Sequence, residues 1–209
     1  MTALVKYPFT YKNENFITEI LSENKVLAFP TETVYGLGGN AFSKEVADRI
    51  YLIKQRPRNK PFPILITLKW LKKLCLWNDP RIDNLIEAFW PGPLTLILKI
   101  NPDLPNHLKN KSGALAVRYS SSTIVQRLIE LGKCPLIGTS ANKANSPACI
   151  SAEEVRHHLK DDIDIIIDGY SGSEKSSSTI VHCITEPFRI IRKGPISLKE
   201  LNQICIVNK

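Results

Sequence analysis

The residues best suited to chemistry lie in a glycine-rich segment and in a basic cluster that follows it by about one helix. Residues 30–40 read PTETVYGLGGN, and residues 54–57 read KQRP. The glycine-rich segment directly follows the apolar run VLAF at residues 26–29, so we expect it to leave the end of a buried strand, where open α/β sheets place their ligands. Small residues that face positive charge indicate a phosphate site.

The common glycine-rich phosphate motifs do not account for this segment. The pattern G-x-x-x-x-G-K-[ST] is absent from the sequence, and Gly36, Gly38 and Gly39 do not complete G-x-G-x-x-G. Positive charge for a phosphate must therefore come from outside the segment.

Four polar sets stand at the expected ends of strands or helices, and Arg118 ends a further strand. The sets are Thr31 with Thr33; Lys54, Arg56, Arg58 and Lys60; Thr139, Ser140 and Asn142; and Ser176 to Thr179 with Arg192. If these ends converge, hydroxyl groups would line a cleft in which at least three cationic side chains neutralise a polyphosphate. That is the charge complement of a triphosphate.

Each set also has a purely structural interpretation. Thr31 and Thr33 follow a proline and are common turn formers, and basic residues at a helix C-terminus oppose its dipole without any ligand. The Ser-Ala-Asn stretch that begins at Ser140 is typical of a turn, and the serine run at residues 171–178 is typical of a flexible loop. The sets indicate a site jointly rather than singly.

Metal and covalent mechanisms find less support in the sequence. The four histidines lack zinc-site spacing, and no G-x-S-x-G elbow is present. Cys134 and Cys149 are possible nucleophiles, but neither has an evident activating base, and burial is the commoner fate of a cysteine.

Alternating helices and strands must position these residues, which indicates an α/β fold with a twisted mixed sheet flanked by helices. Ser43 is expected to cap a helix that Lys54 and Arg56 close, and Asn13 and Ser151 to cap others. The other expected helices span residues 14–24, 68–76, 81–90, 124–131 and 151–160, with a last one after residue 197. The expected strands span residues 25–29, 64–67, 94–100, 114–118, 135–138, 164–168, 178–184 and 188–192.

Composition limits the classes of protein that the chain can belong to. Its 209 residues fit a single domain, 1–209, with an ordinary globular composition. Five cysteines without C-x-x-C argue against a disulfide framework or a zinc knuckle, and no apolar run approaches the length of a membrane span, so a cytoplasmic location is expected. The net charge of +8 attracts polyanions, which leaves a salt-sensitive RNA-binding module as a second hypothesis.

Eight motifs in a fixed order resemble those of the YrdC/Sua5 family. They are PTETVYGLG from Pro30, KQRP from Lys54, WPGPLT from Trp90, AVR ending at Arg118, TSAN from Thr139, DG from Asp168, STIV from Ser178 and IRKG from Ile191. The match covers about residues 14–200, so we do not expect the extra C-terminal domain that longer relatives carry.

The resemblance implies a concave, basic cleft and a threonylcarbamoyl-AMP synthase activity. That reaction joins L-threonine, bicarbonate and ATP into threonylcarbamoyl-adenylate and pyrophosphate, for modification at position 37 of tRNAs by a downstream transferase complex. Family analogy assigns threonine to Thr31, Arg118, Thr139 and Ser178, and ATP to Lys54, Arg56, Arg58, Ser140, Asn142, Ala148 and Arg192. Lys54 and Arg56 would be catalytic, magnesium would ride on the ATP phosphates, and tRNA or double-stranded RNA would be a possible partner.

Two stretches depart from the family pattern. Many relatives continue past the V-R pair with Pro and then Asp or His, whereas this chain has Tyr119 and three serines after Arg118. Phe62 and Pro63 follow Lys60 and Pro61, which affects the contacts expected beyond Arg58. A related carbamoyl-transfer domain is a third possibility, although such domains occur within larger proteins.

Overall fold

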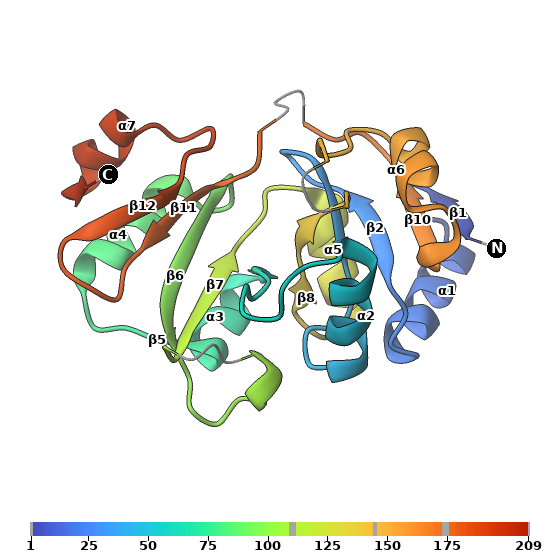
Figure 1. Ribbon diagram of the computed structural model, residues 1–209, viewed down its shortest axis with the longest axis horizontal. Helices are drawn as coiled ribbons and strands as arrows, with labels where there is room; N and C mark the ends of the chain where they lie inside the picture. The colour runs from blue at the N-terminus through green and yellow to red at the C-terminus, as the bar shows by residue number, and fades with distance from the viewer. Residues whose placement is uncertain (1, 109–111, 144–145, 173–175, 209) are drawn as a thin grey trace.

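The chain forms two mixed β-sheets that lie next to each other and are covered by helices. The computed structural model describes residues 2–108, 112–143, 146–172 and 176–208. Figure 1 shows the sheet of β2 and β10 beside the sheet of β6, β7, β11 and β12. The predicted α/β class with a mixed sheet is confirmed, although the strands divide between two sheets.

The first sheet has five strands in the order β1-β10-β2-β3-β9, and the second has eight, in the order β13-β12-β11-β6-β7-β4-β8 with β5 paired to β6. The strands of the first sheet are β1 (Ala3–Lys6), β2 (Leu27–Pro30), β3 (Tyr35–Gly38), β9 (Thr139–Ser140) and β10 (Ile165–Asp168). Those of the second are β4 (Ile64–Leu65), β5 (Cys75–Leu76), β6 (Leu94–Ile100), β7 (Ala114–Arg118), β8 (Leu136–Ile137), β11 (Thr179–His182), β12 (Phe188–Arg192) and β13 (Val207–Asn208). The predicted hairpin of β11 and β12 is confirmed.

Most of the helices begin where a short polar side chain caps them, and α3 is an exception, since the Thr67 side chain makes no capping hydrogen bond. They are α1 (Tyr11–Ser22), α2 (Lys44–Lys54), α3 (Leu68–Leu74), α4 (Pro80–Phe89), α5 (Thr123–Gly132), α6 (Ala152–Leu159) and α7 (Leu198–Ile204), with 3₁₀ turns η1 (Asn106–Leu108) and η2 (Lys160–Asp162). Ser43 caps α2 as predicted, and Ser197 forms a capping box with Glu200 at α7. The prediction for α1 was wrong by one turn, because Thr10 rather than Asn13 accepts the capping hydrogen bond.

Two other cap predictions differ from the structure in detail. Helix α2 ends at Lys54 because Gln55 adopts a left-handed conformation with φ of 50°, so Arg56 lies beyond the helix. At α6 the amide of Glu154 donates to the Ser151 hydroxyl as predicted, but the Glu154 carboxylate accepts from Ile150 instead of Ser151.

Helices cover both sheets and bury two apolar clusters. Helix α1 packs on α5, and both α5 and α6 contact β2, while α3 and α4 lie behind β6, β7 and β11 in Figure 1. One cluster includes Ile17, Leu27 and Leu128, and the other includes Ile50 and Leu96, all of them fully or almost fully buried. The helices that pack on the two sheets therefore fix the relative positions of the strand ends that carry the polar sets.

Part of the glycine-rich segment forms a strand, which corrects the expectation of a loop that leaves the preceding strand. Tyr35–Gly38 is strand β3, antiparallel to β2, and Gly36 pairs with Phe29 and Ser140 across its two edges. A methyl group on Gly38 would lie 1.8 Å from the Ile137 carbonyl oxygen, and one on Gly36 would lie 2.7 Å from the Phe29 ring. Other parts of the same chain pack so closely against these glycines that a side chain would not fit there.

Among the described residues, no helix is long and apolar enough to cross a membrane.

A substitution at Gly38 tests whether packing explains the glycines. Gly38→Ala is expected to lower the free energy of unfolding by about 2 kcal/mol or more, because the new methyl group would overlap backbone of β8. Gly113→Asn is the control: Gly113 has φ of 67°, a conformation that Asn tolerates, and a Cβ added there would meet no described atom within 4 Å, so its cost should stay below about 1 kcal/mol. Urea unfolding measures both, and a Gly38→Ala protein as stable as the parent would contradict the explanation.

Candidate functional site

A cavity of about 380 Å³ lies where the two sheets approach each other. Its walls come from the turn between β2 and β3, the segment after α2, the strands β6, β7, β11 and β12, and strand β9 with the residue before it. The residues of the predicted sets that line it are Thr31, Thr33, Arg56, Lys60, Arg118, Thr139, Ser140, Ser177, Ser178 and Arg192. Side chains from residue 31 to residue 192 thus meet in one place.

The turn between β2 and β3 is a rigid hydroxyl cluster. The hydroxyl oxygens of Thr31 and Thr33 lie 2.9 Å apart, and the Thr31 hydroxyl donates to the Val34 carbonyl at 2.7 Å. The Thr31 hydroxyl also accepts from the Thr33 amide at 3.1 Å. Both side chains are buried, and their mutual bonds hold the turn in a single conformation.

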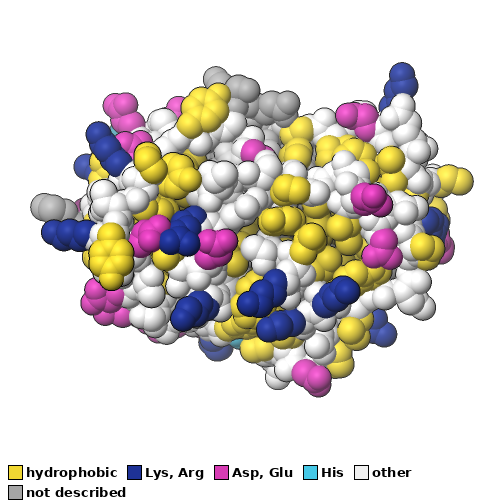
Figure 2. Space-filling model, turned by 180° about the vertical axis from the view of Figure 1, so that it is seen from behind, with side chains coloured by type: hydrophobic (Ala, Val, Ile, Leu, Met, Phe, Trp, Pro, Cys, Tyr) yellow, Lys and Arg dark blue, Asp and Glu magenta, His cyan; other side chains and the backbone are white. Residues whose placement is uncertain are grey.

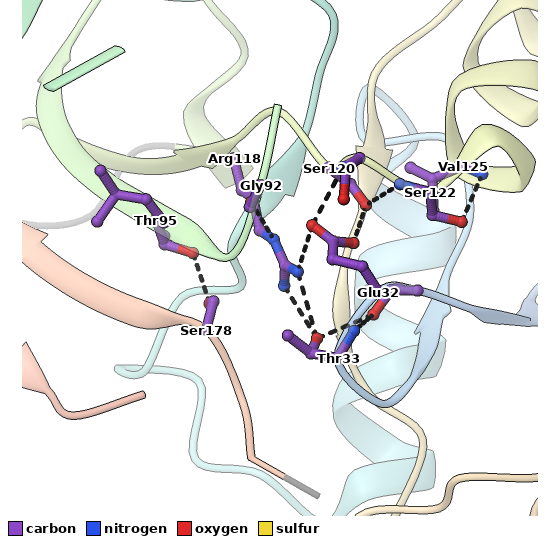
Figure 3. Close-up of polar contacts among 12 residues, drawn as sticks. Glu32, Thr33, Gly92, Thr95, Arg118, Ser120, Ser122, Val125 and Ser178 are labelled. Atoms are coloured by element: carbon purple, nitrogen blue, oxygen red, sulfur yellow. Dashed lines mark hydrogen bonds and ion pairs between the residues drawn. The ribbon is translucent and has the colours of Figure 1, made fainter. Parts of the chain in front are cut away.

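Arg118 at the end of β7 is fixed on several sides. Its Nε donates to the Gly92 carbonyl at 3.2 Å, and Nη1 and Nη2 both lie 3.3 Å from the Thr33 hydroxyl. Its Nη2 forms an ion pair with Glu32 at 2.8 Å, and the Arg118 side chain is 8% exposed. Figure 3 shows the guanidinium group between Thr33 and Glu32.

Glu32 belongs to the same turn and is held from behind by the stretch that departs from the family pattern. Its carboxylate accepts hydrogen bonds from the Ser120 hydroxyl and from the Ser121 amide, the latter at 3.1 Å. Burial raises the pKa of Glu32, but the charge of Arg118 and the hydrogen bonds from Ser120 and Arg118 outweigh it and leave the pKa below its ordinary value. Glu32 is therefore ionised at neutral pH.

Arg192 at the end of β12 faces the cavity from the other sheet. Its Nε donates to the Ser178 carbonyl at 3.0 Å and its Nη2 to the Ser178 hydroxyl at 2.9 Å, and that hydroxyl lies 2.8 Å from the one on Thr95. Arg192 is exposed overall, yet partial loss of hydration, followed by the charges of Arg118 and Arg56, lowers its pKa to about 10. The fold therefore brings the positive charge of Arg192 close to those of Arg118 and Arg56.

Arg56 lines the cavity from the segment that follows α2. Its Nε donates to the Lys60 carbonyl at 2.8 Å, its Nη2 donates to the Pro61 carbonyl at 3.1 Å, and its guanidinium carbon lies 5.2 Å from the centre of the Phe62 ring. Burial lowers the pKa of Arg56. Within the described ranges, neither Arg56 nor Arg192 forms an ion pair with a carboxylate.

Lys54 lies behind the cavity wall instead of lining it. Its ammonium group donates to the Ser140 carbonyl at 2.5 Å, to the Asn142 carbonyl at 2.7 Å and to the Asn142 side-chain oxygen at 3.1 Å. All three acceptors are formally neutral. Burial, followed by the charge of Arg56, lowers the pKa of Lys54 to about 8. The ammonium group thus holds the segment that presents Ser140.

Three other residues that the resemblance assigns to ATP lie away from the cavity wall. The Asn142 side-chain oxygen accepts from the Ser140 hydroxyl at 2.6 Å, so Asn142 braces Ser140. Arg58 pairs with Asp48 outside the cavity, with its guanidinium carbon 5.5 Å from the centre of the Tyr51 ring. Ala148 is half-buried, and its neighbour Cys149 accepts the amide of Tyr35. Their roles stay predictions.

Nucleophilic and metal chemistry gain no support from the described side chains. Burial raises the pKa of Cys134 and of Cys149 to about 11, which makes both poor nucleophiles. In the described residues, no group of three or more histidine, cysteine or acidic side chains could hold a metal ion.

Sequence reasoning missed Glu32, Thr95 and Ser120 as members of the site. Glu32 is a carboxylate between two threonines in a turn beside a buried strand, which is a recognisable signal. Thr95 is a hydroxyl within the apolar strand β6, where it is fully buried. Ser120 gives no signal of its own, because its role depends on how β7 approaches the turn between β2 and β3.

Elsewhere on the molecule, basic side chains are accompanied by acidic ones, unlike most of those around the cavity. On the face shown in Figure 2, basic and acidic side chains are interspersed around apolar ones. Salt bridges such as Arg127 with Glu14 and Arg49 with Asp164 pair opposite charges elsewhere. The cations around the cavity form a separate arrangement, with Glu32 as the carboxylate paired to one of them.

Comparison with known proteins identifies the family. The family model Sua5_yciO_yrdC, described as telomere recombination, matches residues 19–194. A threonylcarbamoyl-AMP synthase of Pyrococcus abyssi is 35% identical over 185 residues, which are 88% of this chain and 54% of that protein. One from Marinobacter nauticus is 33% identical over 77% of this chain and 85% of its own length.

A solved structure agrees with this assignment. The crystal structure of P. abyssi Sua5 complexed with L-threonine has a TM-score of 0.92 at 31% identity and covers 100% of this chain and 62% of that one. The chain thus spans little more than half the length of the P. abyssi protein. The chain belongs to the Sua5/YciO/YrdC family.

Proposed function

We propose that this chain is a threonylcarbamoyl-AMP synthase that makes threonylcarbamoyl-adenylate and pyrophosphate from L-threonine, bicarbonate and ATP. One observation carries the proposal: Arg56 and Arg192 face a single cavity with neutral oxygen partners, while Lys54 supports its wall. A polyanion stabilises cationic side chains that are held close together without carboxylate partners. A triphosphate supplies that negative charge.

The surroundings of Arg118 fit a small amino acid. Arg118 is charge-balanced by Glu32 and stands beside the hydroxyls of Thr31 and Thr33. A carboxylate carrying one negative charge suits these balanced, hydroxyl-rich surroundings better than a triphosphate does. The relatives named as threonylcarbamoyl-AMP synthases and the threonine-bound P. abyssi structure support threonine as the ligand.

The proposed chemistry needs no protein nucleophile. Bicarbonate gives carbon dioxide and hydroxide. The carbon dioxide adds to the threonine amine, the hydroxide takes up the amine proton as water, and the anionic oxygen of the resulting carbamate attacks the α-phosphorus of ATP. The new bond joins that oxygen to phosphorus, and the bond from the α-phosphorus to the bridging oxygen breaks and releases pyrophosphate. Arg56 and Arg192 would stabilise the charge that grows on the phosphates. Magnesium, carried by the phosphates, would neutralise part of the same charge.

The reaction itself is the first test of the proposal. Pyrophosphate release is expected only when threonine, bicarbonate and ATP are present together, and mass spectrometry should detect an adenylate that carries threonine. Omitting each substrate in turn provides the controls. Release that is indifferent to threonine would refute the proposed activity.

A pair of arginine variants tests the position of the phosphates. Arg56→Gln is expected to lower kcat/KM for ATP by about 10²- to 10³-fold, because a well-placed donor to the reacting phosphates is lost. Arg58→Gln should change it less than about threefold, since Arg58 pairs with Asp48 outside the cavity. Steady-state kinetics on folded proteins measures both. Equal losses would favour the assignment of Arg58 to ATP and contradict the geometric distinction.

The lowered pKa of Lys54 predicts proton uptake when ATP binds. With a pKa of about 8, this group is about half neutral at pH 8, and a nearby triphosphate favours its ammonium form. Calorimetry at pH 8 in two buffers of different ionisation enthalpy should show uptake of up to about half a proton per ATP. Lys54→Met should abolish the uptake, whereas Lys44→Gln, at an exposed pair with Asp48, should preserve it.

The lowered pKa of Lys54 also determines how the free energy of unfolding changes with pH. The pKa of Lys54 is lower in the folded chain than its ordinary value of 10.5. Its burial therefore costs stability below about pH 8, and that cost is relieved as the pH rises from about 8 toward 10.5. If the parent protein took up no proton with ATP, or if Lys54→Met took up as much, the assignment of the shift to Lys54 would be wrong.

A further inference from the structure

The three arginines of the cavity differ in how their charge is compensated. Arg118 forms a close ion pair with Glu32, whereas the partners of Arg56 and Arg192 are carbonyl and hydroxyl oxygens. Because the three share one cavity, compensated and uncompensated guanidinium groups line the same space. The difference comes from a single carboxylate, that of Glu32.

Hydrogen-bond geometry limits what Arg118 can offer to a ligand. A guanidinium group has five N–H donors. The Nε donor goes to Gly92, both Nη2 donors go to Thr33 and Glu32, and one Nη1 donor goes to Thr33. Among the described residues, one donor on Nη1 has no partner and is left for a ligand, so Arg118 is prepared for a single oxygen contact rather than for a clamp around a phosphate.

Glu32 acts from behind the wall, since the cavity is lined by its neighbours Thr31 and Thr33. The Ser120 hydroxyl and the Ser121 amide hold its carboxylate, and Ser120 is fully buried. The Ser122 amide donates to the Ser120 hydroxyl, and the Ser122 side chain caps α5, as Figure 3 shows. The carboxylate is thereby tied to the start of a helix.

We infer that Glu32, fixed by Ser120, is a positioning residue that neutralises Arg118 and reserves it for the amino-acid carboxylate by making it unattractive to phosphates. This inference rests on the proposed function for the identity of the two substrates. Without the Glu32 charge, Arg118 would become a third uncompensated guanidinium in the same cavity, and a polyphosphate could bind it as well. The Tyr119–Ser122 stretch thus gains a role through Ser120.

A charge-removing variant tests the inference through ligand selection. In Glu32→Gln, the KM for threonine is expected to rise about tenfold, because Arg118 loses the ion pair that positions it. Tripolyphosphate is expected to bind about fivefold more tightly, because one anion-repelling charge is gone. Pyrophosphate should also become a competitive inhibitor against threonine. Glu130→Gln is the matched control: it makes the same change in net charge at an exposed pair with Arg127 on α5 and should leave all three readouts unchanged.

A second pair of variants covers the case in which Glu32→Gln does not fold. Ser120→Ala keeps the carboxylate but removes its hydroxyl donor, and Glu32→Asp keeps the charge but shortens its reach. Both are expected to raise the KM for threonine with a smaller gain in tripolyphosphate affinity. If the folded variants keep threonine KM and tripolyphosphate affinity within twofold of the parent, as residues that only stabilise the fold would, the inference is overturned.

The two readouts separate this inference from the proposed function. If the parent protein shows no threonine-dependent turnover, the proposed function fails, and with it the identity of the amino acid. Tripolyphosphate binding, measured by calorimetry with no substrate present, still decides the role of Glu32. Unchanged affinity in Glu32→Gln would then overturn it.

Discussion

The organisation of this protein depends on holding cationic side chains close together without pairing most of them to carboxylates. Such an arrangement opposes itself by Coulomb repulsion and by the loss of hydration, and the lowered pKa of Lys54 and of Arg192 reflects that cost. The fold maintains the arrangement by giving Lys54 and the three arginines backbone carbonyl partners. Bound negative charge should therefore stabilise the protein as well as react in it.

The two sheets divide this task between them. The first sheet supplies the hydroxyl turn after β2 and strand β9, and the second supplies Arg118 and Arg192 at the ends of β7 and β12. Arg118 is one point at which the sheets are joined by polar contacts, because it belongs to β7 and binds Glu32 and Thr33 of the turn. A change in the relative position of the sheets would alter charge compensation directly.

Much of this arrangement could be predicted from residue patterns. Long apolar runs gave β6 and β7 with correct bounds, the Ser43 and Ser197 caps were found, and most of the polar sets do meet in one cavity. Strand β3 was missed because glycines disfavour strands, and only tertiary packing against Phe29 and Ile137 explains them. The inward position of Lys54 could not be predicted either, because it depends on carbonyl groups 86 to 88 residues away along the chain.

The close packing around β3 affects how homologous sequences should be interpreted. A methyl group at Gly36 or Gly38 would collide with the Phe29 ring or with the backbone at Ile137, so substitution there is restricted on steric grounds alone. Invariance of these positions in an alignment would report the shape of a strand interface, even though they adjoin the cavity. In this segment, a restriction on substitution does not by itself indicate contact with a ligand. A residue such as Ser120, which belongs to no recognisable motif, can matter more to substrate choice than these glycines do.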